Sequence, residues 1–468
     1  MRFTGQEESP LTVQETPPDN TPDRTAPAPA RRLPPTPRGR FLVENARELV
    51  EDPASFLSKC AREYGNIVRL RLIDGQAYLL NHPDAIKEVL VTKSQDFIKV
   101  VSPRNLIRVL AGNGLLSSEG EFWLRQRRLM QPAFHRSRVV NYGDIMIDYT
   151  DRMLSTWQDG ETRDIHEEMM GLTLAIVIKA LFDADAATEA REIAEALAAA
   201  SQHSFTWGLI PTGTDESGEA SRARAIEQVD RLVYSIIRQR RASNQDRGDL
   251  LSMLLHAQDI DNSHMTDQQL RDEIVTLFLA GHETTATCLS WTWYLLSQYP
   301  EVEAKLLAEI HKVLGNRAPT VDDIPDLHYT ELVVHESMRL YPPVWFMSRN
   351  AVRDTEIMGY HVPAGTIMLI SQWVTHRDPR YFDNADACIP ERWDSDLSKR
   401  LPRFAYFPFG GGARLCIGQP FAMIEVVLLL ARIAQQFRLT MVPGHPIKML
   451  PLIALRPKYG LKMRLSKR

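Results

Sequence analysis

Apolar residues recur along most of the chain at helical spacing, and shorter regions alternate as in strands. From residue 121 to about residue 300, nearly every segment has a helical period, as in RARAIEQVDRLVYSIIRQRR. Alternation on both sides of Asp74-Gly75 in NIVRLRLIDGQAYLLNHP predicts a β-hairpin. Further strands are predicted over 359–371 and 446–465. The expected fold class is mostly α with small β sheets.

Three segments interrupt this pattern. Pro53 breaks the helix predicted in ENARELVEDPASFLSKCAREYG, because proline disrupts a helix interior. Residues 207–220 are polar at their centre and are predicted to form a long loop after the helix AEALAAASQHSF. Residues 1–40 hold nine prolines and too little apolar surface to order themselves. We expect a flexible segment over 1–40, or a proline-rich ligand for another protein, followed by one catalytic domain over 41–468.

Composition excludes several classes of protein. The formal net charge of −4 gives no sign of a nucleic-acid partner. The four cysteines lie far apart and form no CxxC pair, which argues against zinc ribbons, iron–sulfur clusters and a disulfide framework. The most apolar run, 275–296, is interrupted at its centre by Gly-His-Glu-Thr-Thr and falls short of a membrane span. We therefore expect a soluble, cytoplasmic protein without a membrane anchor.

The stretch FPFGGGARLCIGQPFA, residues 407–422, places Cys416 between a glycine-rich loop and a predicted helix. A helix N-terminus stabilises a thiolate, so we expect a lowered pKa for this thiol. Glycines at 410–412 and Gly418 would let the backbone approach something bulky and flat, and Arg414 adds a cation. These features suit a thiolate ligand beneath a planar anionic cofactor, although a buried structural cysteine would also fit. A phosphate-binding loop is excluded, because the GxxxxGK[ST] pattern is missing.

The second candidate site is the central AGHETT stretch, residues 280–285. A zinc protease is excluded, because HExxH would need histidine where the chain has Ala286. The Thr284 hydroxyl can bond to the carbonyl of Ala280 and bend or open the helix. Beside Glu283, such a groove could hold water and relay protons. The alternative is a polar kink in a core helix.

Two further pairs carry charge at helical spacing. Glu336 and Arg339 share a helix face among apolar neighbours, and the later segment PERW offers a second arginine, Arg392. The alternative is a solvated pair that stabilises the helix by about 0.2–0.5 kcal/mol. Trp123 and Arg127 are four residues apart and could together clamp a carboxylate; the alternative is a basic surface helix.

Taken together in their order along the chain, the four segments resemble the cytochrome P450 family. They match four of its motifs: FxxGxRxCxG (Phe409, Gly412, Arg414, Cys416, Gly418), [AG]Gx[DE]T[TS] (Ala280, Gly281, Glu283, Thr284, Thr285), ExxR (Glu336, Arg339) and WxxxR (Trp123, Arg127). One departure is Trp393, which follows Pro-Glu-Arg where the family usually has phenylalanine. The motifs span residues 123–418, and the flanking pattern fits from about residue 41 to the end.

The resemblance implies a single triangular domain that binds haem b, with Cys416 as the proximal thiolate ligand of the iron. It implies that Phe409 packs beside the sulfur, that the propionates are bound by Trp123, Arg127, Arg414 and Arg349, and that the porphyrin lies against Ala280, Gly281 and Gly418. It also implies that protons are delivered during oxygen activation by Glu283 and Thr284. A structural network is expected from Glu336, Arg339 and Arg392. A larger side chain at Ala280 or Gly281 would then clash with the cofactor.

The resemblance also implies a monooxygenase that inserts one atom of O2 into a hydrophobic small molecule. The expected pocket residues are Thr276, Leu277, Ala280 and Thr284 on one helix face, then Val344, Trp345 and Phe346, with parts of 99–115 and 203–209. Most of these residues are apolar or aromatic, which favours a terpenoid or fatty-acyl substrate.

Electrons must come from separate proteins, because only about 50 residues follow Cys416. We expect a ferredoxin or flavodoxin with its reductase, with NAD(P)H as the indirect source and basic residues such as Arg403 near the contact. The chain itself is expected to be a monomer. Two other functions stay open: a haem protein that binds or senses lipids without turnover, and a peroxide-driven hydroxylase. The intact Glu283-Thr284 pair favours the monooxygenase over both.

Overall fold

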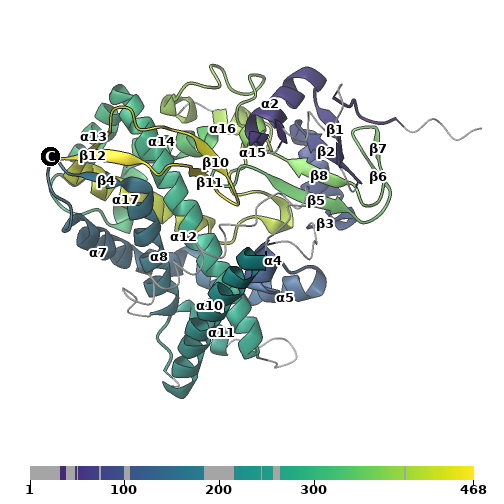
Figure 1. Cartoon of the computed structure of the whole chain (residues 1–468). Helices are drawn as coiled ribbons and strands as arrows, with labels where there is room; N and C mark the ends of the chain where they lie inside the picture. Colours follow the sequence, from purple (N-terminus) through teal and green to yellow (C-terminus); the bar gives the residue numbers. More distant parts are fainter. Residues whose placement is uncertain are drawn as a thin grey trace, which may run out of the picture.

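The structure is a computed structural model that describes residues 32–37, 48–49, 51–72, 75–99, 106–183, 216–243, 245–256, 264–394 and 397–468. Figure 1 shows a mostly helical molecule of roughly triangular outline, with the largest sheet on one side and most of the long helices on the other. The predicted fold class is confirmed. The predicted helix AEALAAASQHSF and nearly all of segment 1–40 lie outside the described residues.

The helices of the described part differ widely in length. They are α2 (Pro53–Tyr64), α3 (Pro83–Lys87), α4 (Leu106–Ala111), α5 (Gly120–Met130), α6 (Arg136–Val139), α7 (Gly143–Leu154), α8 (Ile165–Phe182), α10 (Glu216–Ser243), α11 (Leu250–His256), α12 (Asp267–Gln298), α13 (Pro300–Leu314), α14 (His328–Leu340), α15 (Gln372–Thr375), α16 (Leu397–Arg400) and α17 (Gln419–Gln436).

The strands form one five-stranded sheet and three smaller ones. They are β1 (Ile67–Leu72), β2 (Gly75–Leu80), β3 (Phe97–Ile98), β4 (Thr162–Asp164), β5 (Met347–Ala351), β6 (Thr355–Ile357), β7 (Tyr360–Val362), β8 (Ile367–Ile370), β9 (Phe437–Met441), β10 (Met449–Pro451), β11 (Leu455–Pro457) and β12 (Lys462–Lys467). The large sheet has the order β1-β2-β8-β5-β3, and β4-β12-β9 form the three-stranded sheet. The remaining pairs are β6-β7 and β10-β11.

Local sequence signals place several elements correctly. The predicted hairpin is present: β1 and β2 pair antiparallel, with Leu72 opposite Gly75. Pro53 ends the first helical stretch because it opens α2 instead, and the Asp52 carboxylate caps that helix by accepting from the Ser55 N–H at 3.1 Å. One boundary is wrong, since the loop predicted over 207–220 is already helical from Glu216 onward.

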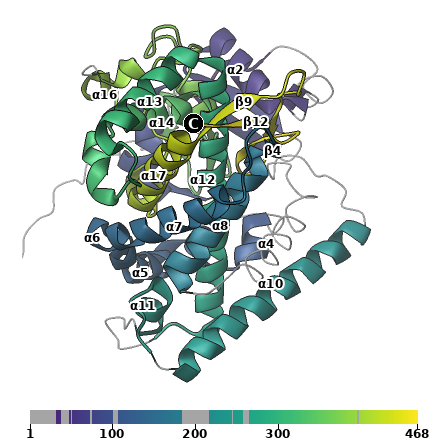
Figure 2. The ribbon, with the colours of Figure 1, turned by 90° about the vertical axis from the view of Figure 1, so that its left-hand side faces the viewer.

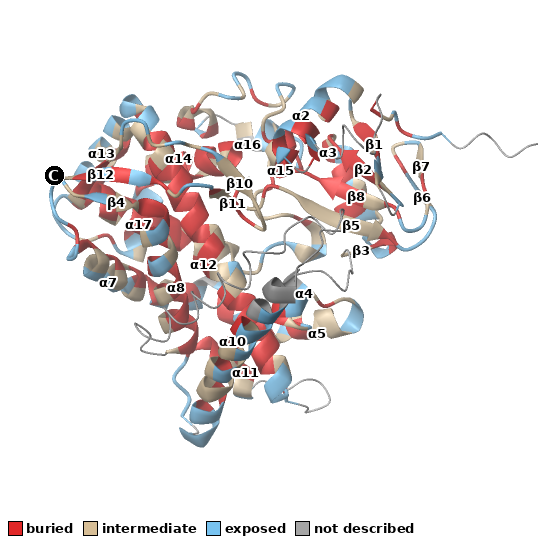
Figure 3. Ribbon diagram, in the orientation of Figure 1, coloured by how far each residue is buried: buried red, intermediate tan, exposed pale blue. Residues whose placement is uncertain are grey.

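The long helix α12 forms the centre of the molecule. It begins at a capping box made by Thr266 and Gln269 and then runs for 32 residues. Figure 2 shows it passing through the middle of the molecule, and it packs against α8, α10, α14 and α17. Figure 3 shows that its residues are mostly buried, as expected for a helix covered on several sides. Within the described ranges, no helix is both long and apolar enough to cross a bilayer.

Candidate active site

The loop that carries Cys416 is fixed by short backbone hydrogen bonds. The Gly410 N–H donates to the Phe407 carbonyl at 2.9 Å, and the Cys416 N–H donates to the Phe409 carbonyl at 3.0 Å. Helix α17 starts three residues after the cysteine, as the sequence predicts. Of the four cysteines, Cys416 is the exposed one, while Cys60, Cys288 and Cys388 are buried. The sulfur therefore lies at the start of a helix and is open to a ligand.

The pKa of the Cys416 thiol is raised, not lowered as the sequence predicted. Desolvation raises it, and this outweighs the N–H groups of Gly418 and Gln419 and the nearby Arg127 cation, which all favour the thiolate. The Cys416 thiol is therefore exposed at its surface and yet surrounded closely enough by protein to be desolvated. A bound metal cation would supply the positive charge that a thiolate needs there.

The glycines of this loop make room for protein groups. Gly410 and Gly412 have φ of 74° and 69°, values that side chains other than glycine rarely adopt. A Cβ on Gly412 would come within 2.0 Å of the Leu90 carbonyl oxygen, and one on Gly411 within 2.3 Å of the Phe404 ring. On Gly418 it would meet only the Cys416 Sγ, at 3.9 Å. Turn geometry requires glycine at 410 and 412, and close packing requires it at 411 and 412; the expectation that the glycines of this loop also admit a flat cofactor stays a prediction.

Arg414 lies in a cluster of charged groups beside this loop. Its guanidinium carbon is 3.9 Å from the centre of the Trp123 ring, a cation–π contact. Its Nη2 donates to Glu119 Oε2 at 2.6 Å, while its buried Nη1 has no hydrogen-bond partner among the described residues. The Lys99 N–H donates to the other Glu119 oxygen at 3.0 Å. One N–H donor group of Arg414, at Nη1, therefore remains available to a ligand.

Positive charge in this cluster exceeds negative charge. Desolvation and the cations Arg414 and Arg349 lower the pKa of Lys99 to about 7, and Glu119 only partly opposes them. Desolvation and Arg414 likewise lower the pKa of Arg349 to about 10. Three cationic side chains against one carboxylate, with one N–H donor unpaired, fit a further dianionic group such as the two propionates of a haem. Sequence reasoning missed Lys99 and Glu119, because neither belongs to a spaced motif.

Trp123 and Arg127 make separate contacts with the cysteine loop, and their joint binding of a carboxylate stays a prediction. The Trp123 ring lies under Arg414, whereas Arg127 Nη1 donates to the Leu415 carbonyl at 2.8 Å. Both residues thereby connect α5 to the cysteine loop, from different sides. Phe409 is half-buried and packs against the main hydrophobic core.

On α12, a short accessible strip interrupts an otherwise buried surface. Ala280 is exposed and Thr284 is half-buried, although Leu277 and Phe278 just before them are buried. The Thr284 hydroxyl donates to the Ala280 carbonyl at 2.8 Å, as predicted. The helix nevertheless remains continuous through this region. The strip offers a small side chain and a hydroxyl one turn apart.

Gly281 faces a neighbouring helix. A Cβ there would come within 2.9 Å of Val177 Cγ2 on α8. Close packing of α8 and α12 is by itself a reason for glycine at this position, and the expectation that a cofactor also excludes a larger side chain here stays a prediction. Ala280 alone of the pair is exposed.

Glu283 makes a contact that the motif did not predict. Its Oε1 accepts a hydrogen bond and a salt bridge from Nε of Arg456, on β11, at 2.6 Å. The side chains are 7% and 19% exposed, so the pair is largely shielded from water. The partner is distant in sequence and follows no motif, so only the folded chain reveals it.

Glu336 and Arg339 form a fully buried, bidentate pair. Arg339 Nε and Nη2 donate to the two Glu336 oxygens at 2.9 and 2.8 Å, and its other N–H groups donate to backbone carbonyls of His376, Ala385 and Ala387. The alternative of a solvated surface pair is therefore wrong. Buried ion pairs need such complete partnering, because desolvation is costly.

Arg392 joins the same network, as does an unpredicted donor. Arg392 Nε donates to Glu336 Oε1 at 3.0 Å, and Trp393 Nε1 donates to Glu336 Oε2 at 2.9 Å. The tryptophan that departs from the usual family residue thus gives Glu336 a hydrogen bond that phenylalanine cannot make.

The residues predicted to line a substrate pocket are only partly accessible. Thr276 is buried beneath Gly114, and Leu277 belongs to the main core. Trp345 is fully buried and donates from Nε1 to the Leu452 carbonyl at 3.0 Å, and its contact with a substrate stays a prediction. Val344 and Phe346 are half-buried. Segment 203–209 lies outside the described residues.

Comparisons with known proteins identify the family of this chain. The family model described as Cytochrome P450 matches residues 34–463. The chain is 37% identical to cyclooctatin synthase of Streptomyces melanosporofaciens, over 90% of this chain and 92% of that protein. It is 32% identical to pentalenene oxygenase of Streptomyces avermitilis, over 91% and 96% of the two chains. The crystal structure of the cytochrome P450DA haem domain superposes with a TM-score of 0.86 at 27% identity, covering 94% of this chain and 98% of that one.

The chain belongs to the cytochrome P450 family, and it is an enzyme of the family's monooxygenase class. Membership implies a haem cofactor, a substrate and a source of electrons. The excess positive charge around Arg414 and the accessible thiol of Cys416 fit that cofactor.

Proposed function

We propose that this protein inserts one oxygen atom of O2 into a hydrophobic small molecule of the terpenoid class, with electrons delivered by a separate protein. One observation carries the proposal. The accessible Cys416 thiol, the partly unpaired Arg414 and the α5 residue Arg127 meet around one loop, as a haem–thiolate site requires. Relatives named pentalenene oxygenase and cyclooctat-9-en-7-ol 5-monooxygenase, which act on terpenoids, support the substrate class.

Each of these side chains would have a distinct role. Cys416 would hold the haem iron, while Arg414, Arg349 and Lys99 would hold the propionates. Haem ligated by a cysteine thiolate supplies the electron density that favours O–O cleavage. The Thr284 hydroxyl, bonded to the Ala280 carbonyl, can give up its own hydrogen bond to present a proton on the accessible strip of α12.

Glu283 would replenish that proton, and Arg456 sets its geometry. The contact with Arg456 Nε holds the Glu283 carboxyl group in place, next to Thr284 in the sequence. For Glu283 to pass on a proton from water, this pair must loosen. We infer that Arg456 governs how readily protons pass to Thr284.

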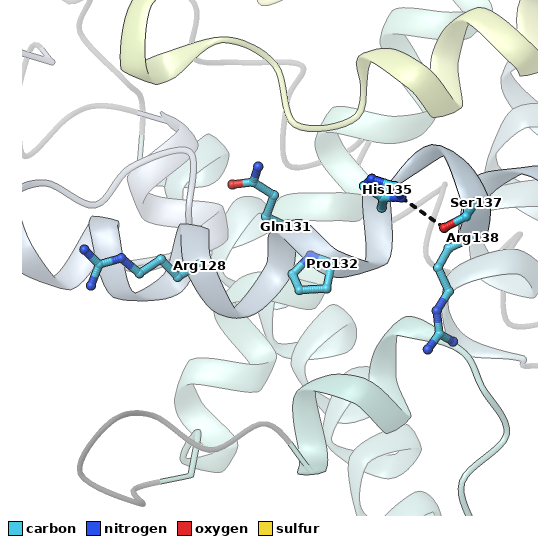
Figure 4. Close-up of a pocket in the computed structure, with 6 residues that line it drawn as sticks. All are labelled: Arg128, Gln131, Pro132, His135, Ser137 and Arg138. Carbon is cyan, nitrogen blue, oxygen red and sulfur yellow. Dashed lines mark hydrogen bonds between the residues drawn. The ribbon is translucent and has the colours of Figure 1, made fainter.

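A basic groove on the segment from α5 to α6 suits an acidic electron donor. It has a volume of about 550 Å³ and is lined by Arg128, Gln131, Pro132, His135, Ser137 and Arg138. Figure 4 shows the side chain of Arg128 at one end of the groove and that of Arg138 at the other, with His135 Nδ1 and Ser137 Oγ 2.9 Å apart between them. Arg128 is on the same helix as Arg127, which contacts Leu415. We propose that a ferredoxin or flavodoxin docks here, reduced in turn at the expense of NAD(P)H.

The haem assignment is tested by the spectrum of the reduced, carbon monoxide-bound protein. Cys416→Ala should lose the thiolate-type Soret band, while Cys60→Ala, a buried cysteine far from the loop in sequence, should keep it. A thiolate-type band in Cys416→Ala would contradict the ligand assignment.

The reaction itself is tested with ¹⁸O2 and a panel of terpenes and fatty acids, supplied with reduced ferredoxin. One labelled oxygen atom in the product is expected. Substrate-induced Soret shifts without product would indicate a lipid-binding or sensing protein. Product formed from peroxide but not from O2 and electrons would indicate a peroxide-driven hydroxylase.

A further inference from the structure

His376 connects the buried Glu336–Arg339 pair to the loop of Cys416. The residue follows α15 and is fully buried. Its carbonyl accepts from Arg339 Nη1 at 3.0 Å, and its ring Nε2 accepts from the Phe407 N–H at 2.9 Å. One residue therefore touches the ion pair through its backbone and the cysteine loop through its side chain.

The contact at Phe407 lies at the start of that loop. Phe407 also accepts the Gly410 N–H, and Phe409 accepts the Cys416 N–H. A shift at Phe407 would thus be passed on to Cys416 through the two backbone bonds that shape the turn.

The hydrogen bond fixes the protonation of the ring. A backbone N–H can only donate, so Nε2 must be without a proton and the neutral ring must carry its proton on Nδ1. On that side the Met338 carbonyl of α14 is near, although Nδ1 makes no hydrogen bond of good geometry. Desolvation and the cations Arg339 and Arg377 hold the pKa of His376 well below its usual range, which agrees with a neutral ring.

Aromatic packing limits how the ring can move. The His376 ring centre is 4.9 Å from that of Tyr406 and 5.2 Å from that of Phe407, the latter edge-on. Tyr406 is itself tied to α14, since its hydroxyl donates to the His335 carbonyl at 3.1 Å. Both hydrogen bonding and packing therefore hold Nε2 towards the Phe407 N–H.

We propose that His376 is a positioning residue for the iron ligand. Its neutral imidazole accepts the Phe407 N–H and so holds the cysteine loop at a fixed position relative to the Glu336–Arg339 pair. The inference rests on the proposed role of Cys416 as the haem ligand. It assigns His376 no contact with substrate or cofactor.

The test compares His376→Leu with His376→Gln in the full-length, haem-loaded protein. Glutamine keeps an acceptor of similar reach, whereas leucine leaves the Phe407 N–H without one. We expect His376→Leu to lose a large share of the thiolate-type band in the reduced carbon monoxide complex and to release haem to an acceptor protein roughly tenfold faster. His376→Gln should stay close to wild type in both readouts.

A control variant separates positioning from general damage to the fold. His166→Phe removes another buried histidine, which bonds to Ser290 on α12, and should lower stability without changing the Soret band. If His376→Leu matches wild type, or if His376→Gln is as impaired as His376→Leu, the proposal is wrong. Failure of the ligand assignment would instead show as a thiolate-type band in Cys416→Ala.

A measurement on the unmodified protein keeps the proposal testable if His376→Leu does not fold. Nitrogen NMR of ¹⁵N-histidine-labelled protein should show His376 as the neutral tautomer with its proton on Nδ1, assigned by the signal lost in His376→Gln. A tautomer protonated on Nε2, or a charged ring at neutral pH, would overturn the proposal.

Discussion

At the scale of single residues, Thr284 is the most accessible polar group on α12 near Ala280. Its hydroxyl is half-buried and bonds only to a main-chain carbonyl of its own helix. Neighbouring threonines differ: Thr285 and Thr287 are buried, and Thr287 Oγ1 has no partner among the described residues. The Thr284 hydroxyl can therefore reach a reacting group, whereas the Thr285 and Thr287 side chains are enclosed by protein.

We predict that Thr284→Ala keeps haem and substrate binding but diverts electrons to peroxide and water. The proton donor is lost while the protein groups around the haem remain, so product per NAD(P)H should fall roughly tenfold or more. Product and hydrogen peroxide are measured per NAD(P)H consumed. Thr287→Val is the matched control, and equal coupling in Thr284→Ala and wild type would contradict the prediction.

At the scale of elements, two of the contacts that hold α12 in place involve charged or titratable side chains. Arg456 on β11 pairs with Glu283, and His166 on α8 bonds to the Ser290 hydroxyl at 3.0 Å. Each joins the central helix to a different part of the chain. Both are largely buried, so each contributes to stability as well as to the site.

We predict that Arg456→Met destabilises the fold by about 3 kcal/mol, because it leaves the Glu283 carboxylate buried and unpaired. Glu283→Gln combined with Arg456→Met should recover part of this loss, because no unpaired charge then remains. Urea unfolding of the four proteins of this double-mutant cycle gives the coupling energy. Additive losses would show that the two side chains do not interact in solution.

We predict that His166 makes the α8–α12 contact sensitive to acid. Desolvation, followed by the Arg456 cation, lowers the pKa of His166 to about 4, against about 6.5 in an unfolded chain. Between these values the unfolded state binds more protons than the folded state, so stability falls as pH falls from about 6.5 to about 4. At 1.36 kcal/mol per unit, this amounts to about 3 kcal/mol.

The comparison protein for that prediction is His166→Gln, which cannot titrate in this range. Unfolding free energies of both proteins are measured from pH 7 to pH 4. The wild type should lose stability relative to the variant as the pH decreases. Parallel curves would mean that His166 has the same pKa in the folded and unfolded states.

At the scale of the whole molecule, the proposed haem site joins parts that lie far apart in sequence. Lys99 follows β3, Arg349 is on β5, Trp123 is on α5, and Cys416 precedes α17. Three cations gathered against one carboxylate repel each other, so the dianionic cofactor should stabilise the folded chain as well as serve catalysis.

We predict that Lys99→Met weakens haem retention. Haem transfer to an acceptor protein should be roughly tenfold faster, which corresponds to about 1.4 kcal/mol. Lys93→Met is the control, since its pair with Glu88 is partly exposed and such pairs contribute little. Equal transfer rates for both variants would remove Lys99 from the cofactor site.

Features that depend on neighbouring residues in the chain could be predicted from the sequence alone. These include the mostly helical class, the hairpin at Gly75, the start of α2 at Pro53, and the bond from Thr284 to Ala280. Residue spacing and local hydrogen bonding set them, and both can be read from a short segment. The ordered motifs also identified the family, because their residue types and spacing are specific.

Which distant groups meet depends on the tertiary structure. It paired Glu283 with Arg456, placed Lys99 and Glu119 beside Arg414, and buried Trp345. It also packed protein groups closely against Gly411 and Gly412 and raised the pKa of the Cys416 thiol. Desolvation and long-range contacts arise only when separate segments pack together, so no local pattern in the chain records them.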